Sequence, residues 1–219
     1  MKLELKALEL QISALEDEKT EIEKLIHDFE VRHSQELGEL ILKILRLRRE
    51  KLKEEAKKDE TKKKDYTEAE KDFKEYNQTY EATKDEHILE LTEEQRRDIK
   101  TAYRKASKLC HPDVVMDEHK AEAEKMFKDL KDAYDKNDLQ KVNELLNCLE
   151  KGIFQNKSEK TDEKKKLKNI IERLRIKRNE IEKTVNGLKN NETFKTIEDI
   201  GNWDEYFADT KRKLNEELA

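Results

Sequence analysis

The sequence contains very little of what interrupts a helix or crosslinks a fold. Its 219 residues include four glycines and one proline, too few for a typical disordered polymer. Its two cysteines, Cys110 and Cys148, form no CxxC pair and no disulfide framework, so we expect a reduced, cytoplasmic protein. No apolar run approaches the roughly 18 residues of a membrane span, and charges interrupt the N-terminus too often for a signal peptide.

The composition is dominated by charged residues and by the helix formers Glu, Lys and Leu. Charged residues make up 46% of the chain and hydrophobic residues 34%, which favours long helices and coiled coils over one large core. The net charge of −5 argues against a general nucleic-acid binder, although local basic faces remain open. We expect no enzyme and no cofactor, because the chain has no phosphate-binding glycine loop and no serine beside a plausible base.

Apolar residues repeat with heptad spacing from Met1 to about Leu52 and again over 163–190. Such an N-terminal helix needs a partner to cover its stripe: its copy in a homodimer, or residues 163–190 of the same chain. Lys19 and His33 interrupt the heptad seam and weaken a parallel zipper, so we slightly favour folding back. The two seams are Met1, Leu8, Leu15, Ile22 and Phe29, and Leu5, Ile12, Ile26 and His33.

Shorter helices are expected in the middle of the chain. Residues 53–65 are almost all charged and could form a turn or a solvated helix, and the absence of glycine and proline slightly favours helix. Thr92 opens a capping box and a helix that ends near Cys110. Helices over about 118–136 and 139–149 follow, and a second capping box at Asn202 opens a terminal helix.

The pattern therefore predicts an all-α fold in four consecutive segments. We expect a long coiled-coil helical region over 1–86, an antiparallel helical module over 87–152, a linker over 153–162 and a C-terminal helical hairpin over 163–219.

The single proline belongs to the tripeptide His111-Pro112-Asp113. Proline ends a helix, so these residues should form the loop between two antiparallel helices. From the residues alone, a plain turn and an exposed recognition loop are about equally plausible. We expect no metal at Cys110, His111, Asp113 and His119, because the proline turn makes their side chains point in different directions.

The helix before this loop has two contrasting faces. Ile99, Tyr103, Ala106 and Cys110 share one face on a helical wheel. The roughly opposite face carries Arg97, Lys100, Arg104 and Lys108. A helix of this kind is suited to pack against a helical neighbour while it presents cations to an acidic protein surface.

Residues 102–113, with the sequence AYRKASKLCHPD, resemble the second helix and signature loop of the J-domain, the module of DnaJ-type co-chaperones. Residues 123–134 are similar to the third helix of that family, and the resemblance covers about 91–149. It implies that the protein stimulates ATP hydrolysis by a DnaK-type chaperone and has no nucleotide site of its own.

The resemblance also implies roles for individual residues. His111, Pro112 and Asp113 would trigger hydrolysis, and a basic face would dock on the chaperone. The docking face would comprise Arg97, Lys100, Arg104, Lys105 and Lys108. The core of the module would comprise Ile99, Tyr103, Leu109, Phe127, Leu130 and Tyr134.

The sequence departs from the family pattern in three ways. The usual first helix is not evident, so His87–Leu91 or the stripe from Tyr76 to Tyr80 must substitute for it. Val114 and Val115 stand where basic residues are commoner, and glycine/phenylalanine-rich and cysteine-rich zinc regions are missing. Two hypotheses follow: a specialised co-chaperone whose coiled-coil flanks bind an unknown protein partner or client, or a structural coiled-coil adaptor with a degenerate J-like module.

Overall fold

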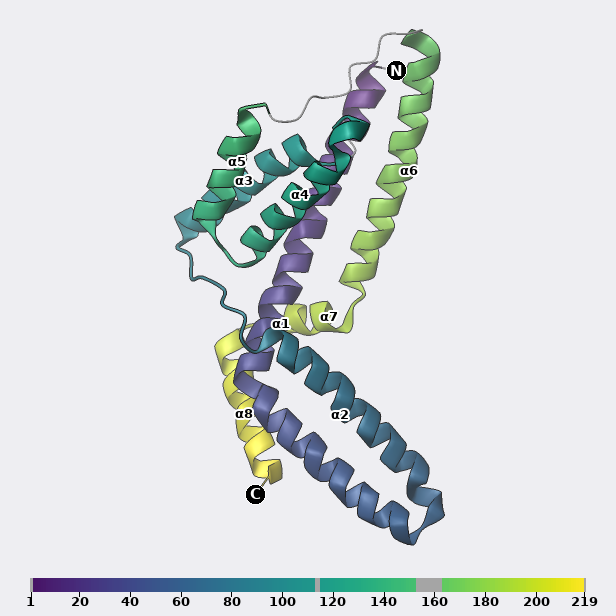
Figure 1. The fold of residues 1–219 in the computed structure, drawn as a ribbon, viewed down its shortest axis with the longest axis vertical. Coiled ribbons are helices and arrows are strands. Elements are labelled where there is room, and N and C mark those ends of the chain that lie inside the picture. Colours follow the sequence, from purple (N-terminus) through teal and green to yellow (C-terminus); the bar gives the residue numbers. More distant parts are fainter. Residues whose placement is uncertain (1, 113–114, 153–162, 219) are drawn as a thin grey trace. The chain divides into compact units, whose positions relative to one another are not determined.

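The structure, a computed structural model, describes residues 2–112, 115–152 and 163–218 (Figure 1). Within these ranges the regular secondary structure is helical, and the all-α prediction is confirmed. The elements are α1 (Lys2–Lys58), η1 (Glu60–Lys62), α2 (Lys63–Thr83), α3 (Glu93–Cys110), η2 (Asp117–His119), α4 (Lys120–Asp135), α5 (Leu139–Glu150), α6 (Glu163–Lys189), α7 (Glu192–Asp199) and α8 (Trp203–Leu218). None of the helices in the described ranges is long and apolar enough to cross a membrane.

The helices form two compact units that are discontinuous in sequence. The first unit comprises Met1–Lys24 and His87–Asn191, and the second comprises Leu25–Glu86 and Glu192–Ala219. Helix α1 therefore contributes its first part to one unit and its remainder to the other. The four consecutive domains expected from the sequence stay a prediction, and the expected linker 153–162 lies outside the described residues.

Within the first unit, α3, α4 and α5 lie together (Figure 1), and their buried side chains form one apolar core. Within this core the rings of Tyr103 and Tyr134 stack with their centroids 4.3 Å apart. The α4–α5 turn is tight because Asn137 adopts a left-handed backbone (φ 60°) and Asp138 caps α5. The core comprises Ile99, Ala102, Tyr103, Ala106, Cys110, Leu130, Ala133, Tyr134, Val142, Leu146 and Leu149.

The segment before α3 is not helical, which corrects one expectation from the sequence. The Leu89 N–H donates to the Lys136 carbonyl at 3.0 Å, and the Asn137 side-chain amide donates to the Leu89 carbonyl at 2.8 Å. These bonds hold the segment in an irregular conformation against the end of α4, so His87–Leu91 does not form a substitute first helix. The Tyr76–Tyr80 stripe is helical and lies on α2 in the second unit.

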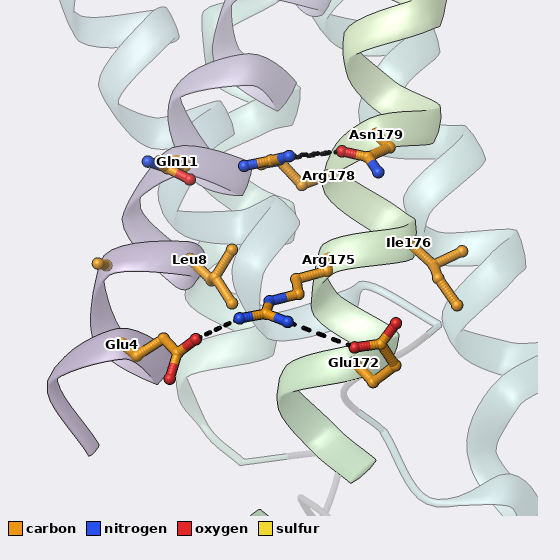
Figure 2. A pocket seen from close by; sticks show the side chains of 9 residues that line it. Glu4, Leu8, Gln11, Glu172, Arg175, Ile176, Arg178 and Asn179 are labelled. Atoms are coloured by element: carbon orange, nitrogen blue, oxygen red, sulfur yellow. Dashed lines mark hydrogen bonds and ion pairs between the residues drawn. The ribbon is translucent and has the colours of Figure 1, made fainter. Parts of the chain in front are cut away.

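The first part of α1 pairs with α6 in the same unit (Figure 2). Leu8 is 6% exposed, and Arg175 of α6 bonds to Glu4 of α1 at 2.6 Å. Two further ion pairs, Lys177 with Glu16 and Lys189 with Glu18, join the same helices. The N-terminal stripe thus folds back on 163–190 over this part of its length, and the homodimer stays an untested alternative.

The second unit is built on the rest of α1. Phe29, Leu37, Ile197 and Phe207 form its buried core, and Trp203 packs edge-on against Phe29 with ring centroids 5.3 Å apart. Trp203 thereby anchors α8. The C-terminal region holds α7 in addition to the two helices expected from the sequence.

The charged stretch 53–65 contains a turn between two helices, at Asp59 and the short η1 helix, whereas the sequence slightly favoured continuous helix. α1 ends at Lys58, and the Asp59 side chain accepts a hydrogen bond from the Thr61 N–H at 2.9 Å. Aspartate at a cap supplies the acceptor that a new helix needs, so no glycine or proline is required for the break. α2 then returns along α1, where Thr83 donates to Ser34 at 2.6 Å.

Gly38 allows this α1–α2 packing, and a matched pair of substitutions tests it. A Cβ at position 38 would overlap the ring of Tyr80, whereas one at Gly187 in α6 would meet nothing within 4 Å. Helical Gly→Ala changes normally stabilise by up to about 1 kcal/mol. We predict that Gly187→Ala raises the free energy of unfolding in urea and that Gly38→Ala lowers it. An equal gain from both substitutions would show that Tyr80 does not pack over Gly38.

Candidate functional site

The candidate site is built on α3, whose buried side fixes how the helix is rotated. Thr92 and Gln95 form the complete capping box that starts it, as the sequence predicts. Ile99 and Tyr103 are 2% and 6% exposed, and Leu130 and Tyr134 of α4 are buried against the same core. Phe127 is partly buried beside them.

Leu109 is the exception among the residues assigned to this core. Its side chain is 36% exposed, which places it at the surface. Successive residues of an α-helix point about 100° apart, and the neighbouring Cys110 takes the buried direction. The resemblance to the J-domain family implied that Leu109 is a core residue. That expectation is wrong, because the rotation of α3 points Leu109 toward solvent.

His111 ends α3 and leaves the helical conformation, with φ −63° and ψ 128°. Its imidazole is half-buried and meets the Phe127 ring of α4 edge-on, with centroids 5.5 Å apart. Pro112 follows and is also half-buried, and Asp113 and Val114 lie outside the described residues. Val115 is fully buried, so an apolar residue there contributes to packing. The position of His111 is therefore set by both helices of the hairpin.

The five cations expected on the docking face divide into two groups. Arg97, Lys105 and Lys108 are exposed, and within the described part of the chain they form no ion pair. Lys100 and Arg104 are only 37% and 38% exposed, because they meet α1 of the same unit.

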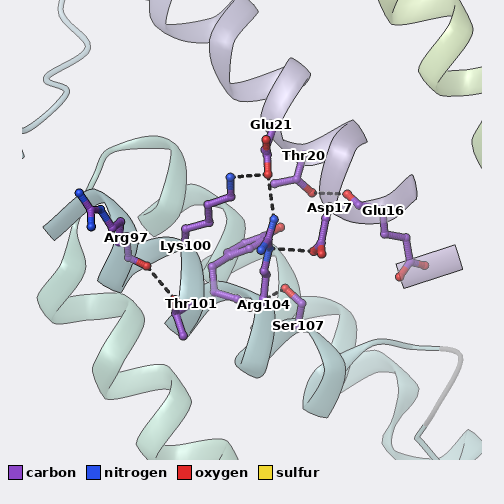
Figure 3. Close-up of polar contacts among 10 residues, drawn as sticks. Glu16, Asp17, Thr20, Glu21, Arg97, Lys100, Thr101, Arg104 and Ser107 are labelled. Atoms are coloured by element: carbon purple, nitrogen blue, oxygen red, sulfur yellow. Dashed lines mark hydrogen bonds and ion pairs between the residues drawn. The ribbon is translucent and has the colours of Figure 1, made fainter. Parts of the chain in front are cut away.

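Figure 3 shows the second group in contact with acidic residues of α1. The Arg104 guanidinium lies 3.0 Å from Asp17 through Nε and 2.8 Å from Glu21 through Nη2. Glu21 also pairs with Lys100. Both acidic residues lie on one side of α1, since they are four residues apart.

A neighbouring contact joins α1 to α4. Lys131 pairs with Glu23 at 2.9 Å, and Lys24 donates to the Asp135 carbonyl at 3.2 Å while its ammonium lies over the Tyr134 ring. Desolvation alone would lower the pKa of Lys131, but the hydrogen bond and charge of Glu23 raise it above its ordinary value. Sequence analysis missed Asp17, Glu21 and Glu23. The four-residue spacing of Asp17 and Glu21 indicates an acidic face, but it does not indicate which helix that face would meet.

Within the described ranges, no group of three His, Cys, Asp or Glu residues is placed to hold a metal ion. Cys110 is fully buried in the core, and His119 lies 3.8 Å from Glu118 and from Glu122. The described part of the candidate site is therefore a His-Pro helix end beside a cationic helix face.

Comparison with known families identifies the class of this helical module. Residues 87–136 match the family described as DnaJ domain. The chain therefore carries a J-domain, the module of DnaJ-type co-chaperones, over less than a quarter of its length. The comparisons with curated proteins and with solved structures gave no match.

The two cysteines test the packing of the α3 end. Burial raises the pKa of the Cys110 thiol to about 11, so about one thiol in a thousand is ionised at pH 8. Cys148 is only half-buried. We predict that iodoacetamide at pH 8 alkylates Cys148 well before Cys110, as measured by peptide mass spectrometry. In urea the two rates should converge; equal rates in the folded protein would contradict the buried end of α3.

Proposed function

We propose that this protein is a specialised co-chaperone. Its His111-Pro112-Asp113 loop stimulates ATP hydrolysis by a DnaK-type chaperone, and the cationic face of α3 docks on an acidic surface of that chaperone. The helical flanks direct the chaperone to a protein partner or client. In this proposal the nucleotide is bound by the chaperone, in keeping with the general role of J-domain proteins.

The observation that carries this proposal is the joint placement of His111 and three cations on one helix within the matched DnaJ domain. His111 lies at the C-terminal end of the same helix that carries Arg97, Lys105 and Lys108. These three side chains are exposed, and in the described ranges no acidic residue of the chain neutralises them. Uncompensated cations on a rigid helix can steer and orient an acidic partner before contact.

A structural adaptor with a degenerate module is the second candidate. Two observations favour it: Lys100 and Arg104 already have intramolecular partners, and the segment before α3 lacks the family's first helix. An adaptor would bind its partner through the helical flanks and leave chaperone ATP hydrolysis unchanged.

A single-turnover measurement of ATP hydrolysis by a DnaK-type chaperone separates the two candidates. We predict that the wild-type protein accelerates hydrolysis and that His111→Gln abolishes the acceleration, because the imidazole is lost from the loop. His87→Gln is the matched control, since His87 is exposed and lies outside α3. Equal acceleration by His111→Gln and wild type would contradict the proposed role of the loop.

The cationic face has its own test. Lys105→Glu/Lys108→Glu should weaken binding to the chaperone at least tenfold, because two attractive contacts become repulsive. The control is Lys168→Glu/Arg173→Glu, an equal charge change on exposed residues of α6. Binding can be followed by surface plasmon resonance with the chaperone immobilised. Equal losses from both double variants would mean that net charge, and not the α3 face, governs docking.

A further inference from the structure

The acidic side of α1 covers part of the surface that the proposed function assigns to chaperone docking. We define the acidic segment as Asp17–Glu23, which includes Asp17, Glu21 and Glu23. Together these three carboxylates pair with Lys100 and Arg104 of α3 and with Lys131 of α4. The segment belongs to the same compact unit as the DnaJ domain.

We propose that the acidic segment is a built-in competitor of the chaperone: it masks Lys100 and Arg104 in the free protein and must be displaced for full docking. This inference rests on the proposed function and concerns the regulation of the same site. The segment presents carboxylates to the basic face of α3, which is the chemistry that an acidic chaperone surface would also present.

The two contacts would use the same side-chain nitrogen atoms, so they compete. Asp17 and Glu21 approach two different nitrogen atoms of Arg104, and Glu21 reaches Lys100 as well (Figure 3). The space enclosed between α1 and these side chains is about 10 Å³, room for no more than a single water molecule. A carboxylate from another protein therefore cannot reach Arg104 from this side while α1 is in place.

The same contacts are weak enough to be reversible. The ion-paired side chains are between 28% and 46% exposed, and ion pairs in such surroundings are screened by water and salt. Ile22 is 6% exposed, so apolar burial also holds the segment. Arg97, Lys105 and Lys108 stay open to a first encounter with an acidic surface. A partner that engages them can then compete for Lys100 and Arg104.

The test removes the charge of the segment while keeping side-chain size. Asp17→Asn/Glu21→Gln and Glu21→Gln are compared with Glu9→Gln, a control on an exposed residue of α1 that has no ion pair in the described ranges. Single-turnover ATP hydrolysis by a DnaK-type chaperone is measured at one subsaturating concentration of each protein, with circular dichroism as the check on folding. Acetylation of individual lysines by an N-hydroxysuccinimide ester, read by mass spectrometry without chaperone, reports the contact itself.

If the mask exists, the double variant stimulates hydrolysis roughly three- to tenfold more than wild type, which is the range expected for the loss of a few exposed ion pairs. Lys100 acetylation rises in both variants, while Lys105, Lys108 and the Glu9→Gln control stay at the wild-type level. Combining the double substitution with His111→Gln removes the stimulation.

Two results would overturn the inference and leave the proposed function intact. One is equal stimulation by wild type and the double variant, with Lys100 acetylation raised, since the contact would then open without affecting docking. The other is Lys100 acetylation that is the same in the variants as in wild type, while every protein that retains His111 stimulates hydrolysis. The contact would then be absent in solution. If neither wild type nor any variant stimulates hydrolysis, the proposed function fails, and the inference fails with it.

Discussion

Burial of Ile99, Tyr103 and Ala106 against α4 and α5 fixes the rotation of α3, and the geometry of the candidate site follows from that rotation. Once these side chains are inside, Arg97, Lys105 and Lys108 must face solvent and His111 must emerge at the edge of the hairpin. The capping box at Thr92 sets where the helix begins, and Pro112 limits where it can end. A recognition surface of this kind needs no cavity, because its function depends on the direction of a few charged groups.

Almost half of the residues are charged, so the helices are held together by many ion pairs as well as by apolar packing. Each exposed ion pair contributes about 0–1 kcal/mol, so no single pair fixes a helix in place. The pairs of α1 with α3, α4 and α6 act instead as a set of replaceable contacts around modest apolar packing. That property suits a protein whose cationic helix is proposed to exchange an internal acidic partner for an external one.

The sequence predicted those features that depend on local chemistry. The capping box at Thr92, the end of α3 at Cys110 and the turn at Asn137-Asp138 all follow from side chains within a few residues of the backbone they shape. Features that depend on distant contacts could not be read in this way. The seam of α1 is apolar along most of its length, but nothing local indicates that its first part joins one unit and its remainder another. The assignment of Leu109 to the core failed because a transferred role carries no information about helix rotation, and the break at Asp59 was missed because one capping side chain replaced the expected glycine or proline.

The central claim, that α1 and a DnaK-type chaperone compete for one cationic face, can be tested by hydrogen–deuterium exchange on the unmodified protein. Backbone amides of 13–24 and of 93–110 are followed with and without the ATP-bound chaperone. We predict that exchange over 13–24 becomes faster when the chaperone binds, because the displaced segment loses its packing, while exchange over 93–110 becomes slower. Slower exchange over 93–110 with no change over 13–24 would contradict competition, since it would mean that the chaperone docks while α1 stays in place.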